Sequence, residues 1–208
     1  MSSIEAKSLP VVKKLYYEQK LTAQEIANHF KVTLKAVYYF MRSNNLRRRS
    51  YSTFNRLRFE KSPLSFKIKN PVSLQDRKLK TTGIVLYWGE GYKALGGHSV
   101  DFANCDPAMV VTFLKFLRKI CGVNESRLRV LLYCYSNQDI PELLKFWSKL
   151  THIPLSQFSK PYVRNDFQKE KIGKMKFGMV HIRYADIRLR QIILDWIEEH
   201  KKIFAPVV

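Results

Sequence analysis

The first 46 residues have the apolar spacing of a short helical bundle. Leu9, Val12 and Tyr16 recur at intervals of three and four residues, which places their side chains on one face of a helix. Thr22 and Glu25 then form the S/T-x-x-E pattern of a capping box, in which a hydroxyl and a carboxylate satisfy free amides at a helix start. We therefore expect a first helix from about residue 8 and a second one that begins after the capping box and runs to about residue 30.

A third helix is predicted directly after a short turn. Thr33 is a favourable N-cap residue, and Val37 and Met41 are spaced to face inward from the helix that follows. Two short helices joined by a tight turn form a helix-turn-helix pattern. Residues 9–46 resemble the helix-turn-helix of resolvases and sigma-factor-like DNA readers. Those families often carry glycine at the turn position occupied here by Lys31, so we expect a left-handed backbone at this lysine.

The resemblance implies that the third helix enters the major groove of double-stranded DNA. Side chains near the start of such a helix reach the edges of the bases. The candidate DNA-contacting residues of this helix are Thr33, Leu34, Lys35, Tyr38, Tyr39 and Arg42. Two alternatives stay open: Lys35 and Arg42 hold phosphate, or the unit is a plain three-helix bundle with a solvated basic face and packed tyrosines.

Residues 47–79 contain many cations and no sustained apolar period, which predicts a basic linker between domains at 1–46 and 80–208. Arg47, Arg48 and Arg49 open this stretch. They occupy the place of an arm that runs along the DNA backbone or into a minor groove. The alternative is a solvated arginine run.

Helical and strand patterns alternate from residue 80 onward. An apolar helix bracketed by Gly83 and Gly89 ends in Glu90 and Gly91. Period-two alternation predicts strands near residues 98–104, 127–135 and 176–184, and helical stripes predict helices near 107–121, 141–150 and after Asp186. The segment 158–176 interleaves rings and cations, and is interpreted either as a plain exposed loop or as a flexible phosphate-binding segment.

The helix that ends at Glu90 resembles the divergent LAGLIDADG motif of the homing-endonuclease superfamily. Gly89-Glu90-Gly91 stands at the motif's terminal triplet of small residue, acid and glycine, whereas Val85 and Trp88 depart from its first glycine and first acid. The resemblance covers about residues 80–200. It implies an α+β protein: a small all-α helix-turn-helix domain followed by an α/β saddle, which is a mostly antiparallel sheet with helices on one face.

In that superfamily the polar concave face of the sheet lies in the major groove. The resemblance therefore assigns DNA contacts to Arg127, Arg129, Tyr133, His181 and Arg183. This assignment is physically reasonable. The apolar face of the sheet has to pack against the helices, whereas the basic face has to remain hydrated or bind an anion.

The same resemblance gives Glu90 the role of catalytic and metal-binding acid. Two such carboxylates hold Mg²⁺ for phosphodiester hydrolysis in the superfamily. One motif per chain then requires a homodimer that supplies Glu90 twice, packed through Gly83 and Gly89. Lys93 either orients a metal-bound water or neutralises Glu90. The alternative is that Glu90 merely ends a helix and that no cofactor is used.

Charge strengthens the case for a polyanionic partner. The chain has 37 Lys and Arg against 17 Asp and Glu, a net charge of +20, and residues 1–80 hold 18 of the basic but only 5 of the acidic side chains. Apolar runs are too short to cross a bilayer, and no secretory signal is visible at the start. Cys105, Cys121 and Cys134 have no metal-ligand spacing and are interpreted as buried or spectator thiols.

These patterns predict a sequence-specific DNA-binding protein of regulator type in a prokaryotic cytoplasm, associated with the nucleoid. An active Mg²⁺-dependent homing endonuclease is the first alternative, and a basic RNA-binding or structural protein is the second. The chain has no Walker loop, nucleophile elbow or HExxH spacing, which argues against other common catalytic classes.

Overall fold

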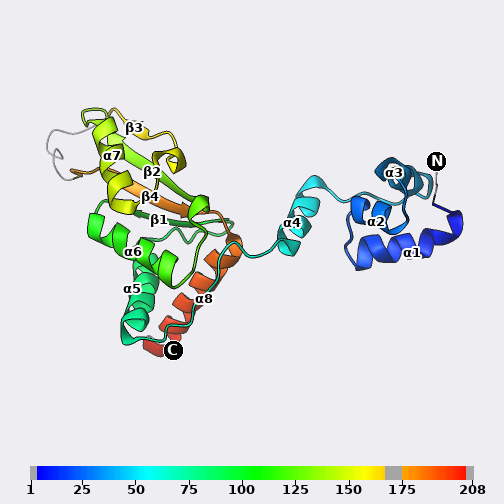
Figure 1. Cartoon of the computed structure of the whole chain (residues 1–208), viewed down its shortest axis with the longest axis horizontal. Helices are drawn as coiled ribbons and strands as arrows, with labels where there is room; N and C mark the ends of the chain where they lie inside the picture. The colour runs from blue at the N-terminus through cyan, green and yellow to red at the C-terminus, as the bar shows by residue number, and fades with distance from the viewer. Residues whose placement is uncertain (1–3, 167–174, 205–208) are drawn as a thin grey trace. The chain divides into compact units, whose positions relative to one another are not determined.

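The computed structural model of the chain describes residues 4–166 and 175–204. These residues hold eight α-helices and a four-stranded mixed sheet (Figure 1), so the α+β class predicted from the sequence is confirmed. The chain divides into two compact units, Met1–Pro63 and Leu64–Val208.

In its described residues, from position 4 on, the first unit consists of helices and the segments that join them. A 3-10 turn (Ala6–Ser8) leads into α1 (Leu9–Lys13) and a π-helical turn (Lys14–Glu18), and these are followed by α2 (Ala23–His29), α3 (Leu34–Ser43) and α4 (Tyr51–Lys61). The first three helices share a small core because their apolar faces meet. Its fully buried side chains are those of Val12, Ile26, Ala27, Val37 and Met41.

The capping signals of the sequence are present in this unit. Thr22 Oγ1 accepts a hydrogen bond from Glu25 N at 3.1 Å, and the Glu25 carboxylate accepts one from Thr22 N at 2.6 Å, which confirms the capping box. Thr33 caps α3 through Ala36 N at 3.2 Å. Lys31, in the turn between α2 and α3, has a φ of +51°. The left-handed backbone expected there is confirmed, although a side chain makes it unfavourable by about 1 kcal/mol.

The second unit alternates helices and strands. Its α-helices are α5 (Leu74–Glu90), α6 (Pro107–Lys119), α7 (Ile140–Thr151) and α8 (Ile187–Phe204). Its strands are β1 (Val100–Asn104), β2 (Leu128–Tyr135), β3 (Tyr162–Arg164) and β4 (Met179–Tyr184), and 3-10 turns lie at Glu125–Arg127 and Leu155–Gln157.

The four strands form one sheet in the order β1-β4-β2-β3. The β1–β4 and β4–β2 pairs are antiparallel, and the short β3 pairs with β2 in parallel. In this register Arg183 of β4 lies between Asp101 of β1 and Arg129 of β2. Successive strand residues point to opposite faces, so these three side chains share one face of the sheet.

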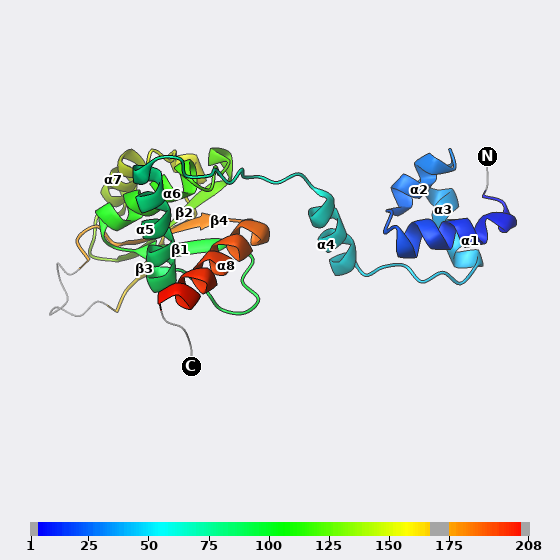
Figure 2. The same cartoon turned by 90° about the horizontal axis from the view of Figure 1, so that it is seen from below.

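The other face of the sheet carries the core of the second unit. Phe102, Val130 and Ile182 are fully buried there, one from each of the three longer strands. Helices α5, α6 and α8 gather on that side in Figure 1, and Figure 2 draws α5 and α8 in front of the strands. Trp147 of α7 belongs to the same core. The polar face therefore has no helix packed on it among the described elements, and it presents half-buried and exposed residues.

Residues 47–79, expected to be a basic linker, contain more structure than their pattern indicated. Helix α4 occupies Tyr51–Lys61, capped by Ser50, and α5 begins at Leu74 rather than near residue 81. The stretch between them runs along residues 120–123: Lys67 N donates to Gly122 O at 3.0 Å. Gly122, with φ +57°, permits this approach, since a Cβ there would lie 2.2 Å from the Lys67 carbonyl oxygen. These partners are distant in sequence, so no local period revealed them.

Among the described residues, no helix is both long and apolar enough to span a bilayer. The three thiols are free; Cys121 and Cys134 are buried, as expected, whereas Cys105 is exposed. Burial raises the pKa of both buried thiols, so they are neutral and inert at ordinary pH.

Candidate nucleic-acid interface

Helix α3 has one buried and one exposed face. Val37, Phe40 and Met41 point into the core of the first unit. Lys35, Tyr39 and Arg42 are exposed. Their spacing of four and three residues puts these exposed side chains on a single stripe. The helix thus offers two cations and one phenol to a partner, on a rigid element anchored by its other face.

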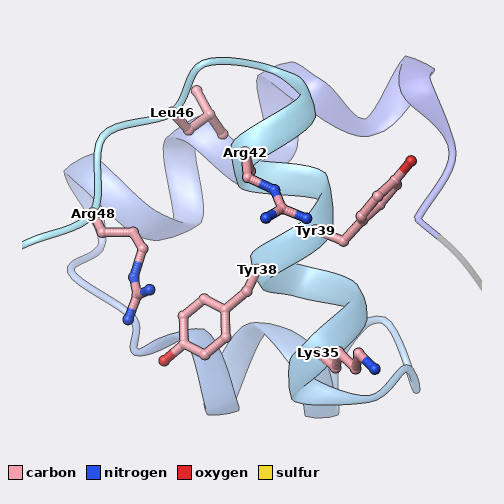
Figure 3. Close-up of a pocket in the computed structure, with 6 residues that line it drawn as sticks. All are labelled: Lys35, Tyr38, Tyr39, Arg42, Leu46 and Arg48. Carbon is pink, nitrogen blue, oxygen red and sulfur yellow. The ribbon is translucent and has the colours of Figure 1, made fainter.

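The exposed stripe borders a hollow of about 510 Å³, drawn in Figure 3. Arginines approach tyrosine rings at two places: the guanidinium of Arg48 lies 4.3 Å from the centre of the Tyr38 ring, and that of Arg42 lies 5.9 Å from the centre of the Tyr39 ring. Such contacts orient the cation without neutralising it. The hollow is lined by Lys35, Tyr38, Tyr39, Arg42, Leu46 and Arg48.

Two residues predicted for base contact at the start of α3 have other roles in the structure. The Thr33 side chain is the N-cap of the helix and accepts from Ala36 N. Leu34 is partly buried and packs against the core of the first unit. Leu46, which the sequence pattern did not single out, lines the hollow from the end of the motif, where its N–H donates to Met41 O at 2.8 Å.

The three arginines at 47–49 differ in exposure and in the contacts that they make. The side chains of Arg47 and Arg48 are exposed, and the Arg47 carbonyl accepts from Tyr17 Oη at 2.8 Å. Arg49 turns back onto its own unit: its Nη1 donates to Leu21 O at 2.8 Å, and its guanidinium lies 4.0 Å from the centre of the Tyr16 ring. The Arg49 side chain is thus held within its own unit through Nη1 and the Tyr16 ring, and its contact with DNA stays a prediction.

The polar face of the sheet brings together four of its five predicted contact residues. Arg129, Tyr133, His181 and Arg183 all point away from the helices. Asp101 lies beside them: its Oδ1 is 2.8 Å from His181 Nδ1, and its Oδ2 accepts from Arg183 Nε at 2.7 Å. Arg129 is held by its own backbone, donating from Nη1 to the carbonyls of Ser126 and Leu128, both at 2.7 Å.

Asp101 is the acidic centre of this face. Burial disfavours its ionised form, but hydrogen bonds and charge from His181 and Arg183 outweigh burial and hold the pKa of the carboxyl below its ordinary value. Asp101 is therefore ionised at neutral pH. It offsets one positive charge and fixes the orientation of both partners. Arg129 lies on β2, beyond Arg183 of β4, and donates to backbone carbonyls instead.

Arg127 lies outside the strand. It ends the 3-10 turn before β2, donates from Nη2 to Ala185 O at 2.6 Å, and lies 5.8 Å from the centre of the Tyr184 ring. The residue remains exposed, but it belongs to the corner of the sheet rather than to its open face.

Strand β3 adds Tyr162 and Arg164, which lie in the segment 158–176 offered above as a phosphate-binding alternative but are not singled out there as contact residues. The Tyr162 ring packs on Tyr133 with centroids 4.8 Å apart, and the Arg164 guanidinium lies 5.9 Å from the centre of the Tyr135 ring. The alternation of rings and cations in segment 158–176 was the available signal. Residues 167–174 of that segment lie outside the described residues.

Glu90, the candidate catalytic acid, is exposed at the last position of α5. The chain enters the sheet edge directly after it, since Gly91 bridges to Phe102 of β1. Lys93 Nζ donates to Gly91 O at 2.8 Å. Within residues 4–166 and 175–204 no group of three metal-ligating side chains occurs.

Gly83 and Gly89, expected together at a dimer interface, have different surroundings. A Cβ on Gly83 would lie 2.1 Å from Phe116 Cγ, because this glycine admits the ring of Phe116 from α6 within the same chain. That expectation is therefore wrong for Gly83. Gly89 has open space around it, and it lies on α5 next to the exposed side chains of Val85 and Trp88.

Comparison with protein-family models, curated proteins and solved structures found no match to this chain. Function is therefore inferred from the residues that these surfaces present and from the charge of the chain.

Proposed function

We propose that the protein is a sequence-specific double-stranded DNA-binding protein of regulator type, in which α3 reads the major groove. The observation that carries the proposal is the exposed stripe of Lys35, Tyr39 and Arg42 on a helix whose opposite face is buried. A helix of this kind fits the major groove, where lysine and arginine bind guanine and tyrosine contacts base edges or methyl groups.

The short turn between α2 and α3 supports a helix-turn-helix. The helices are joined by four residues, with Lys31 left-handed at the turn, and Ala27 is fully buried where they pack. Arg47 and Arg48 follow the motif as exposed cations suited to phosphate. Arg48 also lines the hollow beside α3, so one DNA segment can meet both.

The second unit supplies a further surface for nucleic acid under this proposal. Its resemblance to one LAGLIDADG half is supported by a helix that ends in an acid, by antiparallel pairing of the three longer strands and by helices gathered on one face. The parallel β3 and the additional helix α7 depart from that pattern. Arg129, Tyr133, His181 and Arg183 are the residues of this surface proposed to contact DNA.

The test is selection of a preferred duplex from a randomised pool by the full chain, followed by affinity measurements on alanine variants. Lys35→Ala or Tyr39→Ala is expected to weaken binding of the selected duplex about tenfold and to relax preference at one position. Arg48→Ala is the matched phosphate control, expected to weaken all duplexes alike and to reduce the salt slope by about 1. Failure to enrich any sequence, with equal losses for the three variants, would refute base reading.

The same assay addresses the RNA alternative. Helix α3 fits the wide major groove of B-form DNA, whereas the deep and narrow major groove of A-form RNA excludes it. We therefore expect weaker binding to double-stranded RNA than to DNA of the same sequence at equal salt. Preference for RNA would favour the basic RNA-binding interpretation.

A second candidate function, Mg²⁺-dependent DNA cleavage by a homodimer, is favoured by one observation: Glu90 is exposed beside the exposed Val85, Trp88 and Gly89 of α5. Two copies packed along this helix would bring two carboxylates together, as the two-metal chemistry needs. Incubation of the selected duplex with Mg²⁺ is expected to give cleavage that Glu90→Gln abolishes. Cleavage that survives Glu90→Gln, or a protein that sediments as a monomer on DNA, would rule this candidate out.

A further inference from the structure

Three rings stack in a row across the polar face of the sheet, one on each of three neighbouring strands. The centroids of Tyr162 and Tyr133 are 4.8 Å apart with a tilt of 35°, and those of Tyr133 and His181 are 4.8 Å apart with a tilt of 33°. The centroid distances are those of favourable ring contacts, and the rings are inclined to one another rather than parallel. We refer to Tyr162, Tyr133 and His181 as the stacking row.

The inner end of the stacking row is fixed. His181 Nδ1 is hydrogen-bonded to Asp101, and Asp101 is held in turn by Arg183. Tyr133 lies between the other two rings and is half-buried. The row is therefore pre-organised, and a ligand that stacks on it loses little side-chain entropy of the protein.

The outer end of the stacking row is open. Tyr162 is 55% exposed, on a three-residue strand that pairs with β2 at the edge of the described sheet. An aromatic side chain that contacts another ring on one side and is exposed to water on the other is suited to receive one more flat ring. A purine or pyrimidine base presents such a ring, and stacking of bases on aromatic side chains is a sequence-tolerant source of affinity for single strands.

Charge on the same face selects a ligand that carries phosphate. Arg183 follows His181 by two residues on β4, and Arg129 lies directly opposite Arg183 on β2. Asp101 offsets one of these two guanidinium charges. A single-stranded nucleic acid whose base stacks on Tyr162 can continue along the stacking row. Its later phosphates then meet these arginines.

We propose that the stacking row binds an unpaired base of single-stranded DNA, which extends the row on Tyr162. Bases inside an intact duplex expose their edges and not their faces, so this ligand differs from the duplex proposed for α3. The inference rests on the proposed function only in taking DNA as the partner. It implies a target in which a segment near the duplex site is open or single-stranded.

The experiment compares two strands of about 12 nucleotides, oligothymidine and an abasic backbone of equal length, bound to the full chain. Both carry the same charge, so their difference reports the bases. The wild type is expected to prefer oligothymidine about tenfold, and Tyr162→Leu to abolish most of that preference. Tyr92→Leu is the matched control, because Tyr92 is also 55% exposed but lies off the row, beside β1 at the other edge.

Equal binding of the two strands by the wild type would overturn the inference, as would equal effects of Tyr162→Leu and Tyr92→Leu. Quenching of 2-aminopurine in a single strand by the wild-type protein is a second readout that needs no variant, and its absence also counts against stacking. Tighter binding of RNA than of DNA of the same sequence would overturn the assignment to DNA. If the wild type selects no duplex sequence but still prefers oligothymidine to the abasic strand, the proposed function alone is contradicted. If it selects a duplex sequence but binds the two single strands equally, only this inference is contradicted.

Discussion

Some side chains of this protein stabilise the unit to which they belong, whereas others are exposed to solvent. Residues that are neighbours in sequence can differ in this respect. Arg48 and Arg49 differ most clearly. Arg48 is exposed over the Tyr38 ring, whereas Arg49 is half-buried and bonded to Leu21 O. Composition assigns the same role to both residues, and only their contacts separate them.

Arg49→Ala is expected to lower the free energy of unfolding of the first unit by about 1–3 kcal/mol, because a charged donor and a ring contact are both lost. Arg48→Ala should change stability by no more than about 0.5 kcal/mol, since it is a surface substitution, but should weaken DNA binding. Urea unfolding and duplex affinity of the two variants check the pair. Equal effects on stability would contradict the stabilising role expected of the Arg49 contacts.

Asp186 makes the second unit sensitive to acid. Burial disfavours its charge, but hydrogen bonds from Arg188 and Ser65 outweigh that cost and lower the pKa of the carboxyl. A lowered folded-state pKa stabilises the fold at pH values above the ordinary carboxyl pKa of about 4, and this contribution disappears as the pH falls through the folded value.

Asp186→Asn should therefore destabilise the protein by about 1.5–3 kcal/mol near pH 7 and by much less near pH 3. Asp195→Asn, on the exposed side of α8, is the control and should have little effect at either pH. Urea denaturation at the two pH values measures both. A cost of Asp186→Asn that does not shrink in acid would show that the carboxylate charge is not what stabilises this site.

At the scale of elements, the two glycines of α5 show what sequence could and could not reveal. Their small size was visible, but not which partner each one meets. Gly83 admits Phe116 of α6, and Gly89 faces open space.

Gly83→Ala is expected to cost about 1–3 kcal/mol, because the new methyl group would force the Phe116 ring to move in a packed core. Gly89→Ala should stabilise α5 by up to about 1 kcal/mol through helix propensity, since nothing lies within 4 Å of the new Cβ. Thermal unfolding of both variants gives the comparison. Opposite signs are predicted; a destabilising Gly89→Ala would indicate a contact on that face.

Elements with local signals were predictable from the sequence. The Thr22–Glu25 capping box lies within four consecutive residues and is present in the structure. The helix expected near residues 107–121 is present as α6, capped by Asp106. Strand β3 was not predicted because it is three residues long and depends on β2 for its pairing. Helix α4 was missed because one buried residue, Leu57, gives no apolar period.

The same distinction holds for the candidate site. Lys35, Tyr39 and Arg42 follow from helical spacing, and the residues of β2 and β4 follow from period-two alternation, so their exposure was predictable. Hydrogen bonds between distant residues were not: Asp101 contacts His181 and Arg183 across 80 and 82 positions of the chain. These contacts decide which cations remain available, and only the folded chain shows them.

At the scale of the whole molecule, a net charge of +20 ensures affinity for any polyanion, so binding alone proves little. A regulator of the proposed kind needs specificity in addition, which we propose comes from α3 of the first unit on a duplex and from the sheet face of the second unit on the same nucleic acid. Charge-driven binding weakens steeply with salt for every sequence, whereas discrimination by base contacts persists.

The most direct test is the ratio of affinities of the full chain for its selected duplex and for a scrambled duplex of equal length, measured from about 50 to about 200 mM salt. If α3 reads bases, both affinities are expected to fall together while the ratio stays at about 1,000 or more. A ratio near one across that range would show that the protein binds charge alone, and would contradict the reading of DNA by α3.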